Sequence, residues 1–584
     1  MIKEKLRAAL EEATQRAIQA GKLGALTSCP VPILIEKPRL AEHGDLSCGV
    51  ALKLASTVKT SPIRIAETIA EHVDIGERFV SRFEVAAPGF INFHLGTAWL
   101  NEALSEIHRL ADSFGKSQLG NRQRVLIEYV SANPTGELHI GHGRGAVYGS
   151  CLAHLLRFAG FKVEEEFYVN DTGEQIAQLG RCAWALYQRR LGKAVDYPAE
   201  GYPEESLVDF VDLVIKRHGE GLLNLGGKHG EDKLGDLTKQ IILESQRDLL
   251  LKLGVQFDRW FSELSLHENG RVEAVLERFA RAEMSYEADG ALWLKTKELG
   301  DERDRVLRKS GGNTTYLAAD AAYHEDKFAR GYDRLITIWG ADHHGQVPGL
   351  KAAVRALGYD PDRLEVILNQ IVNLSRDGQS VRMSKRMGTV VTLAEVMDEV
   401  GKDAVRYYLA ESNPQNPINF DLELAKQTSR ENPAFYIQYA HARCCAIMRK
   451  ALEPAVNLES GQEESPPVDS ETWQDFQKAY REQPELFQQI FERDQQVFAH
   501  QKELILHLQG LPEEVEEAAV TRAPGRLARY AYELANHLQK FYEVCRVITS
   551  DKEVTRARLG LIVATRQVLA NVLGIIGVTA PERM

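Results

Sequence analysis

The spacing of apolar residues changes from a strand-like run to a helical pattern between residues 125 and 159. Residues 125–130 (VLIEYV) form a short apolar run rich in β-branched residues, which predicts a buried strand. Asn133, Pro134 and Gly136 then favour a loop. Over residues 140–159 apolar side chains recur at helical spacing, so we expect a helix. A strand, a loop and a helix therefore follow one another here.

This alternation of strands and helices continues over residues 122–400, where Leu335–Trp339 is another apolar strand. Strands that alternate with helices are typical of an α/β fold with a doubly wound parallel sheet. The flanking regions differ, being mixed before this part and helical after it. The predicted organisation is an α+β domain at 1–112, a central domain at 113–400 with a more polar, helical insertion at about 190–280, and an all-α domain at 401–584.

Two histidines, His139 and His142, lie at the predicted junction of loop and helix. The free N–H groups and positive dipole of a helix N-terminus attract anions, and residues three apart share one helix face. Gly141 between them would let a flat base approach the backbone. Taken alone, such a pair more often caps a helix than binds a ligand, and a metal site lacks further ligands. A dinucleotide fingerprint at Gly141-x-Gly143-x-x-Ala146 lies too far after the strand to fit that fold.

A basic segment, Arg382-Met383-Ser384-Lys385-Arg386, follows a predicted turn at residues 376–379 (RDGQ). Cations in a loop near a glycine can neutralise charge on a leaving pyrophosphate. For the segment by itself, an ordinary solvated basic loop is the better explanation. No phosphate-binding GxxxxGK[ST] motif occurs in the chain.

The composition is that of a globular protein with roughly three to four domains. The chain has 584 residues, 44% hydrophobic and 26% charged, without an apolar stretch of membrane-spanning length. Residues 1–20 are an amphipathic helix that contains acids and does not resemble a signal peptide. The 7 cysteines lack a CxxC spacing, which favours a reducing cytosol and argues against disulfides or structural zinc.

The net charge of −12 is confined to one part of the chain. Residues 451–520 hold 4 Lys and Arg against 16 Asp and Glu, a balance of −12 that equals the charge of the whole chain. The acidic stretch from Glu459 to Ser470 within them is expected to be an exposed loop. The overall charge is therefore no argument against nucleic-acid binding, for which a local basic face suffices.

Together, the segment Ser131-Ala132-Asn133-Pro134-Thr135-Gly136-Glu137-Leu138-His139-Ile140-Gly141-His142 and the basic segment resemble the two ATP-binding signatures of class I aminoacyl-tRNA synthetases. The resemblance is to arginyl-tRNA synthetases in particular, and it extends over nearly the whole chain. Further matching segments are Gly44-Asp45, Gly89–Phe93, Asn432-Pro433, Tyr436–Arg443 and Ala580–Met584. Arg382 departs from the family, which usually has lysine there, and its role stays open.

The resemblance implies a role for each matching position. His139, His142 and Lys385 would be catalytic, and ATP would contact Gly141, Asp342, Met383 and Ser384. The arginine pocket would consist of Glu128, Ser131, Asn133, Tyr316, Asp320, His343 and Gln346. The anticodon would be read by Phe541, Tyr542 and Arg546.

Some of these assignments have support in the residues themselves. Tyr316 and Asp320, four apart, would share a helix face, where a carboxylate can accept two guanidinium bonds; without the family, Asp320 could be a surface acid. Glu128 lies on an apolar strand, and a buried carboxylate needs a partner. We expect that partner to be a cationic substrate or a structural arginine.

The C-terminal part has an apolar stripe from Leu527 to Tyr542 that predicts the core of a helical bundle. An exposed Phe541 or Tyr542 could stack on an unpaired base, beside Arg546. Without the family, a solvated basic face explains the arginines better.

The expected reaction activates arginine with ATP, accompanied by Mg²⁺, and transfers the arginyl group to tRNA(Arg). The resemblance also implies a cytoplasmic monomer whose adenylate formation requires tRNA, with no structural metal and no membrane or DNA partner. Three alternatives remain: another class I synthetase, a small-molecule nucleotidylyltransferase, and a non-enzymatic RNA-binding relative. The long helical C-terminal part argues against the second, and the presence of His139, His142 and Lys385 argues against the third.

Overall fold

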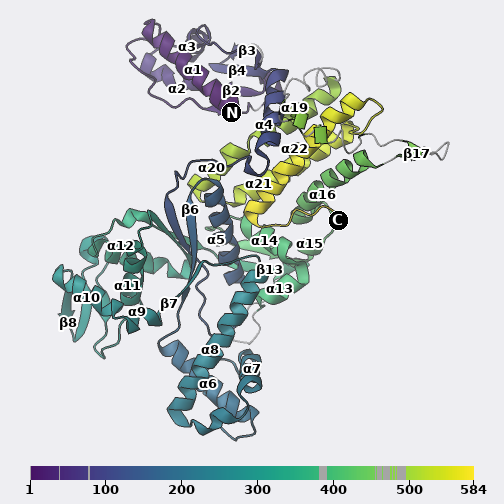
Figure 1. Ribbon diagram of the computed structural model, residues 1–584. Helices are drawn as coiled ribbons and strands as arrows, with labels where there is room; N and C mark the ends of the chain where they lie inside the picture. The colour runs from purple at the N-terminus through teal and green to yellow at the C-terminus, as the bar shows by residue number, and fades with distance from the viewer. Residues whose placement is uncertain are drawn as a thin grey trace.

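The computed structural model describes residues 2–38, 40–76, 79–380, 391–453 and 495–584, with short stretches between 454 and 494. Figure 1 shows a small N-terminal domain at the top, a central α/β body, a helical unit below it and a helical bundle beside it. The predicted basic segment and most of the predicted acidic loop lie outside the described residues.

The central body is built on a five-stranded parallel sheet, as the sequence predicted. Its order is β12-β11-β5-β6-β7, so the chain leaves β5 on one side and later returns to its other side at β11. The carboxyl ends of β5 and β11 therefore flank a topological switch point, where open α/β sheets bind ligands. The strands are β5 (Arg124–Glu128), β6 (Lys162–Val169), β7 (Arg259–Ser262), β11 (Arg334–Gly340) and β12 (Leu364–Asn369).

Helix α5 (Ile140–Phe158) runs against the sheet and confirms the predicted strand, loop and helix. Most of its residues are buried, because the sheet lies on one face and the C-terminal helices pack on another. The glycines and small residues along α5 permit this close packing. A Cβ on Gly149, for example, would lie 2.3 Å from the ring of Tyr129.

A helical unit connects β6 to β7 and has a hydrophobic core of its own. Its helices are α6 (Glu174–Arg190), α7 (Val208–His218) and α8 (Gly227–Lys252). The predicted insertion at about 190–280 starts and ends later in the chain than this unit. It includes β7, which pairs with β6 and so belongs to the main sheet. With only four residues, β7 is too short to interrupt a helical pattern visibly.

The chain between β7 and β11 forms a second connection with its own core. It contains α9 (Leu264–Glu268), α10 (Arg271–Arg281), the antiparallel strands β8 (Ser285–Ala288), β9 (Ala291–Leu294) and β10 (Arg305–Arg308), and α11 (Tyr316–Ala329). After β11, α12 (Val347–Ala356) returns the chain to β12.

A small sheet and several short helices join the central body to the bundle. These elements are β13 (Val372–Arg376), β14 (Gln379–Ser380), β15 (Ile418–Asp421), α13 (Leu393–Val400), α14 (Lys402–Glu411) and α15 (Leu422–Lys426). Strands β13 and β14 pair antiparallel across the predicted RDGQ turn, in which Asp377 and Gly378 have positive φ angles.

The N-terminal domain packs three helices on an antiparallel sheet of order β1-β2-β4-β3. Its elements are α1 (Ile2–Gln19), β1 (Ile35–Glu36), β2 (Leu46–Cys48), α2 (Val50–Val58), α3 (Pro62–Ala70), β3 (Val80–Ala86) and β4 (Phe90–Leu95). Helix α4 (Thr97–Leu110) then leaves this domain and packs against the C-terminal bundle (Figure 1).

The C-terminal bundle consists of long amphipathic or apolar helices. They are α16 (Pro433–Leu452), α19 (Gln495–Gln509), α20 (Leu511–Thr521), α21 (Gly525–Val544) and α22 (Lys552–Ile576), and two short strands, β16 (Ala455–Val456) and β17 (Glu463–Glu464), form a separate pair. Helix α22 has the length and hydropathy of a membrane span, but 72% of its most apolar window is buried inside the protein. It is therefore the core helix of the bundle.

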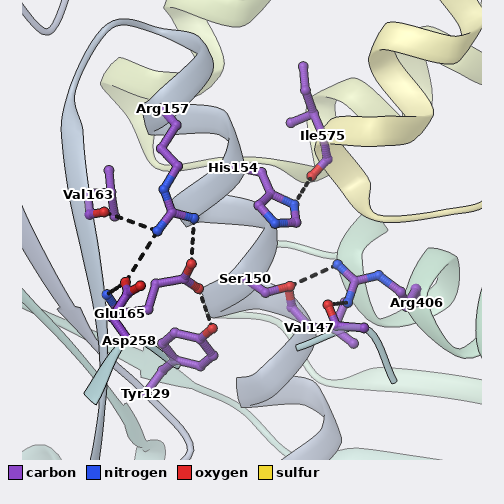
Figure 2. A network of polar contacts seen from close by, with 11 residues as sticks. Tyr129, Val147, Ser150, His154, Arg157, Val163, Glu165, Asp258, Arg406 and Ile575 are labelled. Atoms are coloured by element: carbon purple, nitrogen blue, oxygen red, sulfur yellow. Dashed lines mark hydrogen bonds and ion pairs between the residues drawn. The ribbon is translucent and has the colours of Figure 1, made fainter. Parts of the chain in front are cut away.

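Polar contacts fasten α5 to its neighbours (Figure 2). The hydroxyl of Tyr129 on the β5 side and the guanidinium of Arg157 each donate to Glu165 on β6, at 2.5 Å. At the bundle side, Nδ1 of His154 donates to the Ile575 carbonyl at 3.2 Å. Burial lowers the pKa of His154 to about 4, so this contact is made by a neutral ring.

Arg406 on α14 joins three parts of the molecule through one buried guanidinium. It donates to the carbonyl of Ile576 at 3.0 Å, to that of Leu253 at 3.1 Å and to Oγ of Ser150 at 2.8 Å. These acceptors belong to the bundle, to the end of the helical unit and to α5. The side chain is fully buried, so its loss would leave several acceptors without water or a partner.

We predict that Arg406→Met lowers the free energy of unfolding by about 3 kcal/mol, because buried acceptors would lose their donors. Chemical denaturation followed by circular dichroism measures this. Arg281→Met, at a side chain that is 77% exposed, is the control and should unfold like the parent protein. Equal denaturation midpoints for the two variants would contradict the prediction.

Candidate active site

The loop after β5 carries the predicted histidines to the sheet's switch point. Val130 and Ser131 take positive φ angles of 67° and 40°, which turn the chain sharply out of the strand. Beyond them, the side chain of Gln246 on α8 donates to the carbonyls of Asn133 and Gly136 at 3.3 and 3.0 Å. The helical unit therefore holds the loop in place.

His139 and His142 cap α5 with their own ring nitrogens. Nδ1 of His139 accepts from the Gly141 N–H at 3.1 Å, and Nδ1 of His142 accepts from the His139 N–H at 3.2 Å. The rings stack with centroids 3.8 Å apart. Because each Nδ1 accepts a hydrogen bond, the hydrogen of each neutral ring is on Nε2. The pair thus provides N–H donors at a helix N-terminus, which suits an anion such as a phosphate.

The structure gives a second reason for glycine at position 141, besides the approach of a flat base that the sequence predicted. A Cβ at this position would lie 2.9 Å from Cε1 of His139, which is closer than real contacts allow. The glycine therefore lets the His139 ring fold back over the helix terminus.

A cavity of about 730 Å³ opens at the switch point. It is lined by all the residues that the sequence analysis assigned to the catalytic part and that the structure describes: Glu128, Ser131, Asn133, His139, Gly141, His142, Tyr316, Asp320, Asp342, His343 and Gln346. Met383, Ser384 and Lys385 lie outside the described residues. Thr392, shortly after them, forms a β-bridge with His139, so the chain beyond that segment is anchored beside the histidines.

The exposure of these residues varies from the mouth of the cavity to its floor. Tyr316 is 66% exposed, and the side chains of Asp342 and His343 are 82% and 47% exposed. Asp320 lies one helical turn below Tyr316 and is half-buried. Helix α11 thus presents an aromatic ring at the entrance and a carboxylate below it.

Glu128 has a buried partner that differs from the one we expected. Nζ of Lys327 lies 2.7 Å from its Oε2, with the two side chains 1% and 6% exposed, and Ser131 donates to its Oε1 at 2.8 Å. The structural partner is therefore a lysine and not the arginine that we expected, and Glu128 also lines the cavity. The lysine comes from α11, two turns beyond Asp320, and local sequence around Glu128 contains no sign of it.

The floor of the cavity has more carboxylates than cations. Burial, followed by the negative charges of Glu128 and Glu263, raises the pKa of Asp320 to about 7, and Lys327 opposes this shift. Burial also raises the pKa of Glu263. An excess of desolvated carboxylates favours a cationic ligand, which would relieve their mutual repulsion.

Several residues of the cavity wall were not predicted from the sequence. They include Tyr168, Asn170, Gln175, Glu263, Tyr323, His324, Trp339, Asn369 and Gln370. Glu263 and Asn369 lie at the ends of β7 and β12, so the rule that strand ends carry ligands would have found them once the strands were recognised. His324 could have been found by extending the i, i+4 row of Tyr316 and Asp320.

The residues predicted to contact RNA differ in accessibility. Phe541 is fully buried, so its predicted stacking on a base is wrong: it follows Leu534 and Leu538 on the core face of α21. The next residue, Tyr542, is rotated outward and is 40% exposed. The guanidinium of Arg443 lies 4.7 Å from its ring centroid, and Arg546 is also exposed.

Comparisons with known proteins agree with this organisation. Residues 1–95 match the arginyl tRNA synthetase N terminal domain, residues 105–430 the catalytic domain of class I tRNA synthetases (R), and residues 490–584 the DALR anticodon binding domain. The chain is 42% identical to the arginine–tRNA ligase of Desulfitobacterium hafniense over 583 residues, covering 100% of this chain and 99% of that protein. The chain belongs to the arginyl-tRNA synthetase family.

Other relatives are similar over comparable lengths. The arginine–tRNA ligase of Desulforamulus reducens is 41% identical over 584 residues, covering 100% of this chain and 99% of that protein. A Campylobacter jejuni structure, provisionally assigned as an arginyl-tRNA synthetase, aligns with a TM-score of 0.73 and 32% identity, covering 84% of this chain and 100% of that one. Thermus thermophilus arginyl-tRNA synthetase shares the fold, with a TM-score of 0.71 and 22% identity over 99% of this chain and 100% of that one.

We predict that Lys327→Met destabilises the protein by about 3 to 5 kcal/mol, because it leaves the buried Glu128 carboxylate without its cation. Removing both charges in Glu128→Gln/Lys327→Met should restore part of this loss. Thermal and chemical denaturation measure the effect. Lys228→Met is a matched control, since its 2.7 Å pair with Asp232 is exposed and should contribute little. A single variant as stable as the double variant would contradict the prediction.

Proposed function

We propose that the cavity at the switch point is where this arginine–tRNA ligase activates arginine with ATP and charges tRNA(Arg). The observation that carries the assignment is the convergence of the predicted residues from separate strands and helices on one cavity. Membership of the family and the full-length match to curated arginine–tRNA ligases support the same reaction.

In the first step, an oxygen of the arginine carboxylate attacks the α-phosphorus of ATP. The bond between that phosphorus and the oxygen bridging to the β-phosphate breaks, and pyrophosphate leaves. In the second step, a terminal hydroxyl of the tRNA attacks the activated carbonyl carbon, loses its proton, and AMP leaves. Neither step requires a side-chain nucleophile, so positioning and charge stabilisation carry the reaction.

We assign the negatively charged triphosphate to the donors at the start of α5. His139 and His142 would donate to phosphate oxygens, Gly141 would face the adenine, and Asp342 would accept from the ribose. Met383, Ser384 and Lys385 complete the proposed ATP contacts, with Lys385 stabilising the leaving pyrophosphate.

Magnesium would enter as the complex with ATP. Across the described parts of the chain there is no cluster of three or more His, Cys, Asp or Glu residues that could hold a metal ion.

We assign the guanidinium of arginine to Asp320 below Tyr316, and its α-ammonium and carboxylate groups to Asn133, His343 and Gln346. A carboxylate can accept two parallel N–H bonds from a guanidinium, and the surrounding negative charge supports a cationic substrate. Ser131 would act through the loop, because its hydroxyl donates to Glu128 and accepts from the Tyr168 N–H at 3.2 Å.

For the remaining partners, we propose that Tyr542 and Arg546 contact the anticodon of tRNA. The exposed ring could stack on a base, and the guanidinium could pair with a phosphate. We also retain a three-domain organisation with limits near 112 and 400, tRNA-dependent adenylate formation, and a monomeric enzyme of the cytoplasm.

The reaction is tested by ATP–pyrophosphate exchange with each of the twenty amino acids, with and without total tRNA. We expect exchange with arginine alone, and only when tRNA is present. Exchange with a different amino acid would show that the Tyr316 and Asp320 pocket has been misassigned. No exchange under any condition would favour the RNA-binding alternative.

Arginine binding should depend on pH through Asp320. Its pKa of about 7 means that the carboxyl is protonated below neutrality and must lose a proton before it can pair with a guanidinium. We expect the KM for arginine to rise as the pH falls from 8 to 6, approaching tenfold per unit below the pKa.

The arginine KM measured in the exchange assay between pH 6 and 8 tests this. The KM for ATP over the same range is the internal control and should change much less. Asp320→Asn should weaken arginine binding at every pH and flatten the profile. An arginine KM that is independent of pH in the parent protein would refute this titration.

A further inference from the structure

His324 lies on α11 one helical turn beyond Asp320 and is part of the same cavity wall. The side chain is 1% exposed. Residues four apart on a helix face have Cβ atoms roughly 5–6 Å apart. The imidazole is therefore close to the carboxylate that we assign to the guanidinium, and deeper in the protein.

The backbone determines which nitrogen of His324 carries the hydrogen. Nδ1 lies 2.8 Å from the carbonyl oxygen of Asp320. A carbonyl oxygen only accepts, so Nδ1 must donate. Burial, followed by the positive charge of Lys327, lowers the pKa of His324 well below its usual range. The ring is consequently neutral at pH 7, and Nε2 is an acceptor with a lone pair.

No hydrogen-bond donor reaches that acceptor among the residues that the structure describes. Nε2 of His324 is buried and has no partner. In the ionised forms that pair with a guanidinium, the carboxylates of Asp320 and Glu128 can only accept, and the ammonium of Lys327 is held 2.7 Å from Glu128. A buried acceptor without a donor is costly, and at the wall of a binding cavity the missing donor can come from the ligand.

We propose that Nε2 of His324 accepts a hydrogen bond from a terminal N–H of the bound arginine guanidinium, beside the two bonds taken by Asp320. This inference rests on the proposed function. The guanidinium has five N–H donors in one plane, so it can serve both acceptors at once. Nε2 is buried at the wall of this cavity.

This arrangement would make His324 a specificity residue as well as a substrate contact. Citrulline has an oxygen where arginine has one terminal nitrogen, and that oxygen would bring a second lone pair against Nε2. Sites that hydrogen-bond an N–H reject analogues that lack it far more strongly than apolar pockets reject a missing methylene.

The test compares His324→Leu and His324→Gln with the parent protein, using ATP–pyrophosphate exchange at saturating tRNA. The leucine variant removes the acceptor, so the arginine KM should rise about 10- to 100-fold while kcat changes by less than about threefold. The glutamine variant restores an acceptor and adds an N–H donor. It should recover part of the KM and reduce the preference for arginine over citrulline at least about tenfold.

His441→Leu is a closely matched control. Nδ1 of His441 also lies 2.8 Å from a backbone carbonyl, that of Pro581. The side chain is 2% exposed, and its Nε2 is likewise buried without a partner in the described structure. It belongs to α16 of the bundle. This variant should share any loss of thermal stability but keep the parent KM for arginine.

An arginine KM within about twofold of the parent for His324→Leu would overturn the inference and would mean that Nε2 meets only water. Equal increases for His324→Leu and His441→Leu would also overturn it, because a general packing defect would then explain both. If the leucine variant does not fold, the citrulline preference of His324→Gln decides alone. Absence of arginine exchange in the parent protein would instead refute the proposed function.

Discussion

The structure depends on buried guanidinium groups that are satisfied by uncharged oxygens. Arg144, two residues after the second histidine, is 1% exposed and donates to backbone carbonyls in two loops, at Gln370, Ile371, Asn413, Pro414 and Asn416. Burial lowers its pKa to about 10, so it remains charged at neutral pH. Arg406 makes similar contacts near the middle of α5, where it donates to Ser150. Helix α5 is therefore fixed at its start and at its middle to chain segments far away in sequence, which gives the histidine pair a rigid support.

The cavity floor differs electrostatically from these two arginine sites. There, carboxylates outnumber cations, and the pKa of Asp320 rises to about 7, first because the group is buried and then because Glu128 and Glu263 are nearby. These carboxylates make the folded protein less stable than apolar residues at the same positions would, and functional sites commonly carry such a cost. The benefit is that a cationic ligand gains more there than it would at a hydrated surface. The Glu128–Lys327 pair limits the cost by neutralising one of the acids.

The sequence predicted those features of the fold that depend on interactions between nearby residues. The strand, loop and helix around His139 and the helical face that carries Tyr316 and Asp320 depend on neighbours within a few residues. The partner of Glu128 could not be predicted in this way, because Lys327 lies 199 positions away and meets it only when the sheet forms. Phe541 was misjudged for a related reason: adjacent residues on a helix point about 100° apart, and only the packed bundle decides which of the two is buried.

The histidines of the cavity illustrate how the backbone can set the polarity of a side chain. In His139 and His142, Nδ1 accepts from backbone N–H groups, so Nε2 carries the hydrogen and the rings suit an anion. In His324, Nδ1 donates to a backbone carbonyl, so Nε2 is an acceptor and the ring suits a cation. The first arrangement follows from a helix N-terminus, where N–H groups lack partners, and the second from a helix interior, where a ring can reach the carbonyl four residues back. In the site that we propose, one residue type would therefore donate to the anionic triphosphate at one end and accept from the cationic guanidinium at the other.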